Sequence, residues 1–132
     1  MGLKGRSATP DVPLRHFREL LVNSAPPAQA AARALRGAVR TALPAAAESL
    51  HGGSGGGLAL YHVSGRPVCG IEPAATATLL YIHGVGQEDA PAGLKLDGRG
   101  RDNRYVRFAS VNEVRAQADG IRTLLLRAAA RR

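Results

Sequence analysis

The chain is divided by a glycine-rich run, HGGSGGG, at residues 51–57. Glycine loses more conformational entropy on folding than any other residue, so this run cannot hold regular structure at low cost. It predicts a loop that separates a helical first part from a sheet. Because the chain has 132 residues, one hydrophobic core is sufficient, and we expect a single domain over residues 11–132. Residues 1–10 are basic and lack periodicity, which predicts a disordered arm.

Two helices are predicted before the glycine-rich run. The first has Asp11 as its cap, and its apolar positions recur at spacings of three and four residues: Leu14, Phe17, Leu20 and Leu21. The second begins at Pro26 and Pro27, since proline is tolerated in the first turn of a helix. Pro44 is expected to end this helix or to kink it.

Alternating apolar and polar residues predict five strands after the run. They cover residues 58–63, 68–72, 78–83, 94–96 and 104–108, with a polar turn at 97–103. Connections this short imply mainly antiparallel pairing. Ser110 and Glu113 have the spacing of a capping box and open one C-terminal helix. The expected fold class is therefore α+β, an antiparallel sheet with helices packed on one face.

The alternation also assigns the two faces of this sheet. We expect the helices to cover the face that bears Leu58, Leu60, Cys69, Ile71, Val106 and Phe108. The opposite face then carries aromatic and basic side chains, joined by two arginines of the preceding turn. These candidate ligand-binding residues are Tyr61, Tyr81, His83, Arg99, Arg101, Tyr105 and Arg107. Aromatic rings beside arginines can stack on bases and pair with phosphates, although tyrosine is also a good strand former on any half-solvated sheet.

The charge of the chain favours an anionic partner. Sixteen arginines and two lysines stand against ten acidic residues, which gives a formal net charge of +8. Arginine also makes two-pronged contacts to phosphate and carboxylate more readily than lysine does. An arginine-rich and alanine-rich composition is equally what a high-GC genome gives to any protein. Nucleic acid or a small phosphorylated molecule therefore remains one hypothesis for the partner.

No motif of a catalytic centre or a cofactor is recognisable, so we expect a protein that is not an enzyme. Residues 52–56 match the string G-x-S-x-G, but a strand follows where a nucleophile elbow needs a helix. Aligning Val63 with Val68 would place His62 opposite Cys69, yet two ligands fall short of the four of a closed zinc site. One cysteine, no apolar run of membrane-spanning length and no signal sequence suggest a cytoplasmic protein.

Several strings of the chain resemble the YdhG-like family of unknown function. They are PPAQ at residues 26–29, PVCGI at 67–71, LYIH at 80–83, GRGR at 98–101 and RYVRF at 104–108. The resemblance covers about residues 14–130 and implies a frataxin-like fold, a twisted antiparallel sheet with helices on one face. Some relatives are regarded as iron chaperones that hold iron with acidic surface residues. The resemblance thus implies a non-catalytic domain of the metallochaperone or regulatory kind.

The chain departs from that pattern where iron would bind. Iron is a hard cation and wants clustered oxygen ligands. The segments of the first two predicted helices hold few acidic residues, Asp11, Glu19 and Glu48. They hold more arginines, at positions 15, 18, 33, 36 and 40. An anion-binding or nucleic-acid-binding module that uses the open sheet face is therefore the alternative function.

Overall fold

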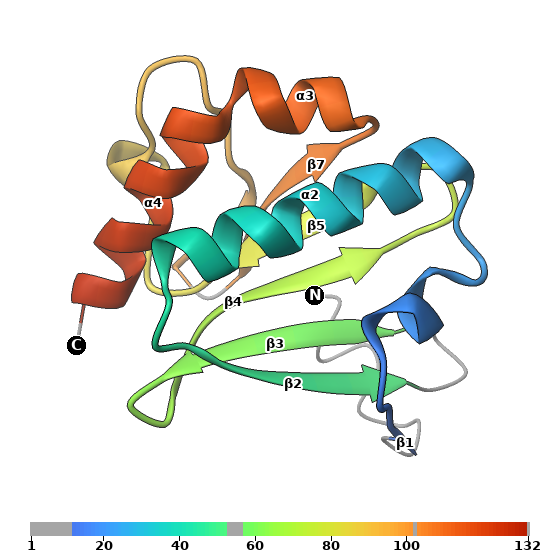
Figure 1. Cartoon of the computed structure of the whole chain (residues 1–132). Coiled ribbons are helices and arrows are strands. Elements are labelled where there is room, and N and C mark those ends of the chain that lie inside the picture. Colours follow the sequence, from blue (N-terminus) through green and yellow to red (C-terminus); the bar gives the residue numbers. More distant parts are fainter. Residues whose placement is uncertain (1–11, 53–56, 102, 132) are drawn as a thin grey trace.

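The computed structural model describes residues 12–52, 57–101 and 103–131. In these residues one antiparallel sheet of seven strands has the order β1-β2-β3-β4-β5-β7-β6, and the helices lie on one of its faces (Figure 1). The α+β class and the antiparallel pairing are therefore confirmed. The predicted arm at residues 1–10, the predicted cap Asp11 and the glycines and serine at 53–56 lie outside the described residues.

The strands are β1 (Val12–Pro13), β2 (Ala47–Gly52), β3 (Leu58–Val63), β4 (Arg66–Pro73), β5 (Thr78–Ile82), β6 (Asp97–Arg99) and β7 (Asn103–Phe108). The helices are the 3-10 turns η1 (Phe17–Leu21) and η2 (Gln87–Asp89) and the α-helices α2 (Pro26–Ala42), α3 (Val111–Ala116) and α4 (Ala118–Ala130).

Helix α2 matches its prediction and lies across the sheet (Figure 1). It starts at the two prolines and stops before Pro44, where the N–H of Leu43 donates to the carbonyl oxygen of Val39 at 2.8 Å. Its buried side is mostly alanine, which allows a close approach to the strands; the buried residues are Ala28, Ala31, Ala32, Leu35 and Val39. The hydroxyl of Thr78 on β5 donates to the carbonyl oxygen of Ala28 at 2.8 Å and ties the helix to the sheet.

The first predicted helix is wrong. Val12 and Pro13 pair with β2 as an edge strand, and only the five residues of η1 form a helical turn. A helix this short is not stable by itself, so tertiary packing decides its form. The side chains of Phe17, Leu20 and Leu21 are nevertheless buried in the core, as their spacing suggested.

Strand β2 was not predicted, and it changes the role of the glycine-rich run. Ala47 to His51 pair antiparallel with Leu58 to His62. The run at 51–57 therefore connects the two strands of one hairpin, and it does not separate a helical part from the sheet. The residues of β2 are mostly half-buried without alternation, which removes the period-two signal that identifies a strand.

Two further predictions near the C-terminus need correction. Residues 94–96 are not a strand; Leu94 and Leu96 are buried in the core, and β6 forms instead from residues 97–99 of the predicted turn. The predicted C-terminal helix is divided at Gln117 into α3 and α4, which both contact α2. Its cap is confirmed, because the Ser110 hydroxyl accepts from the N–H of Glu113 at 3.3 Å.

Candidate functional site

The face assignment of the sheet holds for β4 and β7 and fails for β3. Cys69, Ile71, Val106 and Phe108 lie in the core, as predicted, and Phe108 is only 1% exposed. On β3, however, Ala59 pairs with Ile71 and Tyr61 pairs with Cys69, so these two residues face the core. Leu58 and Leu60 lie on the opposite face, where a Cβ atom added at Gly70 would meet both side chains at 3.2–3.3 Å.

The tight turn at Ser64 and Gly65, which pairs Val63 with Arg66 instead of Val68, removes the predicted pairing of His62 with Cys69. Val63 pairs with Arg66 and His62 with Pro67, and the register then shifts so that Tyr61 faces Cys69. Val68 is the additional residue, and a bulge of this kind redirects side chains locally. Cys69 is fully buried, and burial raises the pKa of its thiol to about 12, which makes it unreactive.

Tyr61 is therefore not part of an open ligand surface. Its side chain is 1% exposed, and its hydroxyl donates to Oε2 of Glu48 at 2.6 Å. Burial and the hydrogen bond to Glu48 raise the pKa of Tyr61. Glu48 also accepts two hydrogen bonds from Arg36, at 2.8 Å from Nε and 2.7 Å from Nη2. This triad joins β3, β2 and α2, so Tyr61 has a structural role.

Four of the predicted residues do lie on the outer face of the sheet. Tyr81 and Tyr105 are Cα partners on β5 and β7, with ring centroids 5.3 Å apart and ring planes inclined by 50°. Arg107 and Arg99 are exposed, and the alternation of β7 and β6 places them on the same face. Tyr81 is only 6% exposed, so this face is less open than the sequence suggested, and Tyr105 is the more accessible ring.

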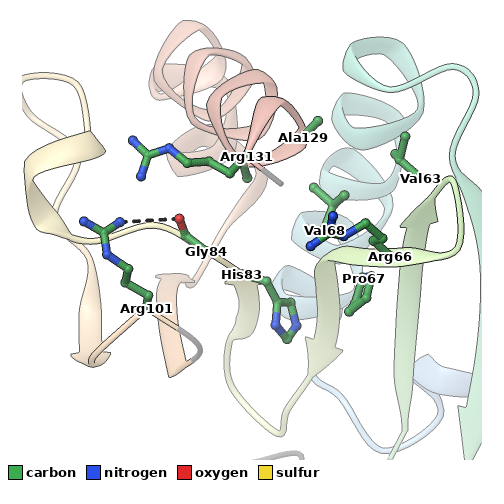
Figure 2. A pocket seen from close by; sticks show the side chains of 10 residues that line it. Val63, Arg66, Pro67, Val68, His83, Gly84, Arg101, Ala129 and Arg131 are labelled. Carbon is green, nitrogen blue, oxygen red and sulfur yellow. Dashed lines mark hydrogen bonds between the residues drawn. The ribbon is translucent and has the colours of Figure 1, made fainter.

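The two remaining predicted residues, His83 and Arg101, lie at one end of the sheet beside a hollow of about 400 Å³ (Figure 2). We call it the sheet-end hollow. It is bounded by the hairpin turn between β3 and β4, the segment after β5 and the last turn of α4. Its lining residues are Val63, Arg66, Pro67, Val68, His83, Gly84, Arg101, Ala128, Ala129 and Arg131.

Asp89 orients two of the arginines at this hollow. Its buried carboxylate accepts from the N–H of Gly86 at 2.9 Å, from Nη1 of Arg101 at 3.3 Å and from Nη2 of Arg131. These contacts, led by the Gly86 N–H, lower the pKa of Asp89. Arg101 also pairs with Glu88. Each arginine keeps further N–H groups for a ligand, because a guanidinium has five.

Arg66 differs from these two. It is exposed, and in the described part of the chain it forms no ion pair. In Figure 2 its side chain extends from the hairpin turn toward the middle of the hollow, whereas the imidazole of His83 points away from the helices. Arg66 is thus placed to contact a ligand directly. Sequence reasoning did not select Arg66 or Arg131, because only the folded chain brings residues 66, 83, 101 and 131 together.

Two of the strings that carry the family resemblance meet at the same place. The N–H of Gly84, which follows the LYIH string, donates to the carbonyl oxygen of Arg101 in the GRGR string at 2.7 Å. Nη1 of Arg101 lies 3.5 Å from the carbonyl oxygen of Gly84 (Figure 2). Gly84 and Gly100 both have positive φ angles, of 77° and 65°, which favour glycine at these turns.

No model of a known protein family, no curated protein and no solved structure matches this chain. Within the described residues, no helix is long and apolar enough to cross a membrane.

Proposed function

We propose that this protein is a non-catalytic binding domain of the YdhG-like kind, with a frataxin-like fold, and that it takes a small anionic ligand in the sheet-end hollow. The observation that carries the proposal is the gathering of Arg66, Arg101 and Arg131 around one concavity. A hollow of about 400 Å³ falls within the usual size range of small-molecule sites. Arginine guanidinium groups match carboxylate and phosphate oxygens in pairs.

The local charge supports an anion at this position. Arg127 donates to the carbonyl oxygen of Asp89 and adds a fourth positive charge next to the three arginines of the lining. Glu88 and Asp89 supply two negative charges, so the cluster keeps a net charge of about +2. Because Asp89 holds Arg101 and Arg131 in place, less conformational freedom is lost when a ligand binds them.

Titration with inorganic phosphate, followed by two-dimensional NMR of backbone amides, tests this site. We expect saturable shifts at Arg66, His83 and Gly84. Arg66→Ala should raise the dissociation constant by about tenfold, since a hydrogen bond to a charged group contributes about 1.5–3 kcal/mol. The matched control is Arg122→Ala, which removes an exposed arginine from α4 outside the lining. No shifts at these amides, or equal affinities for the two variants, would contradict the proposal.

Binding of a single-stranded nucleic acid on the outer sheet face is a second candidate function. The observation in its favour is the contact of Tyr81 with Tyr105, beside the exposed Arg99 and Arg107. Because Tyr81 is nearly buried, base stacking would fall mainly on Tyr105. Fluorescence polarisation of labelled short oligonucleotides at low salt measures this binding. We expect the double substitution Tyr105→Ala and Arg107→Ala to abolish the rise in polarisation. Binding that survives this double substitution would exclude the face as the site.

Iron handling has only the family resemblance in its favour. Among the described residues, no group of three or more His, Cys, Asp or Glu side chains is placed to hold a metal ion. Direct titration with iron, followed by calorimetry, is the measurement that tests this function.

A further inference from the structure

A second basic hollow is lined by residues of η1, α2 and the segment before η1, and it shares no lining residue with the sheet-end hollow. Its volume is about 450 Å³, and we call it the arginine hollow. Its lining residues are Arg15, His16, Phe17, Arg18, Arg33 and Arg36. No local pattern of residues predicts this hollow, because the proximity of its arginines depends on how η1 packs beside α2.

Arg36 forms the fixed wall of this hollow. Its guanidinium lies over the ring of Phe17, 4.8 Å from the centroid, and donates two hydrogen bonds to Glu48. The hydroxyl of Tyr61 binds the same carboxylate. Glu48 is thus occupied by partners inside the fold, and the Arg36 side chain is held in one orientation.

The other three arginines have no such partner. Arg15, Arg18 and Arg33 are exposed, and within the described residues their side chains form no ion pair or hydrogen bond. The neighbouring carboxylate of Glu19 accepts instead from the backbone N–H groups of Arg15 and His16, at 3.0 and 2.7 Å. These backbone bonds, led by that of His16, lower the pKa of Glu19.

The charges around the hollow therefore do not cancel. Among the described residues, four arginines stand against Glu19 and Glu48, which leaves a net charge of about +2 before any contribution from His16. Like charges that line one concavity repel each other, and an anion that enters relieves this repulsion. Among the described residues, the two carboxylates offset only part of this positive charge.

We propose that the arginine hollow binds a compact phosphate group with at least two negative charges, such as pyrophosphate or the terminal phosphate of a small molecule. Three guanidinium groups on two elements can share the oxygens of one such group, because each offers planar paired donors. The ring of Phe17 is covered by Arg36 and gives no open face to a base, which disfavours a stacked nucleic-acid strand. This inference is independent of the function proposed for the sheet-end hollow.

Isothermal titration calorimetry with three probes tests the inference: sodium pyrophosphate, glycerol phosphate and a short single-stranded DNA. Arg33→Ala is the test variant, since Arg33 is exposed on α2 and alanine is the best helix former, so the fold is retained. We expect Arg33→Ala to weaken pyrophosphate or glycerol phosphate binding by about tenfold, the loss of one charge-assisted contact. Arg122→Ala removes the same charge elsewhere and should leave affinity unchanged. Arg66→Ala alters only the sheet-end hollow and should leave the Arg33-dependent part of the binding unchanged.

The probes separate the possible sources of the phosphate. Tighter binding of pyrophosphate would indicate a ligand that carries a diphosphate, and tighter binding of glycerol phosphate would indicate a phosphate monoester. Either result supports the site if Arg33→Ala weakens the binding. Three results would overturn it: no heat from either small probe at low salt, equal losses in Arg33→Ala and Arg122→Ala, or DNA binding that is tighter and equally dependent on Arg33. An effect of Arg66→Ala alone would report on the sheet-end hollow and not on this one, and would likewise count against the arginine hollow.

Discussion

Replacing Leu35 by alanine is expected to lower the free energy of unfolding by about 2–5 kcal/mol. Leu35 is 0% exposed and lies on the side of α2 that packs into the core. The substitution removes apolar contacts and leaves a cavity that the alanine-rich side of the helix cannot fill. Urea denaturation followed by circular dichroism measures the change, and the slope of the transition should stay the same.

Leu126→Ala is the matched control for this experiment. Leu126 is 41% exposed on α4, and the same atoms are removed with little loss of buried contact. We expect a change of less than about 1 kcal/mol. Equal effects of the two substitutions would show that α2 is not packed against the sheet as described.

Replacing Glu48 by alanine is expected to cost about 1–3 kcal/mol, mainly because the buried hydroxyl of Tyr61 loses its acceptor. Arg36 also loses its partner, but it is partly exposed and water replaces much of that interaction. Tyr61→Phe should cost less, since Glu48 stays bound to Arg36. The double variant should be more stable than the sum of the two single changes predicts. Strict additivity in urea denaturation would contradict the triad.

The ionisation of Glu48 is expected to make the free energy of unfolding depend on pH. The hydrogen bonds from Arg36, followed by that from Tyr61, hold the pKa of Glu48 below its ordinary value of 4.5. A lowered pKa means that the folded state favours the ionised form, so the stabilisation is complete above pH 4.5. It is lost as the pH falls through the pKa of the folded state. Glu48→Gln should therefore lose stability less steeply than the native chain when the pH is lowered below this value.

The two hollows share one physical arrangement. In each, a carboxylate inside the fold orients some arginines: Asp89 holds Arg101 and Arg131, and Glu48 holds Arg36. In each, at least one exposed arginine has no acidic partner in the described residues, Arg66 in the first and Arg33 in the second. An anion could then complete contacts that the protein leaves open, with little reorganisation of the oriented side chains.

The sequence by itself was sufficient to predict where α2 and α3 begin and which side chains of β7 are buried. The prolines at 26 and 27 start α2, Ser110 caps α3, and the pattern of residues 104–108 places Val106 and Phe108 in the core. Steric limits on proline, a side-chain cap and a two-residue period act over a few residues, so a single sequence is enough to show them.

Only the tertiary structure decided which face of β3 is inside and where the basic side chains meet. The string LALYHV at 58–63 is apolar on both faces, so its alternation does not choose between Leu60 and Tyr61. The choice follows from contacts with Cys69 on β4, Glu48 on β2 and Arg36 on α2. Arg66 and Arg131, or Arg15 and Arg33, are likewise distant along the chain. Their proximity comes from long-range packing and strand register, which no local pattern of residues encodes.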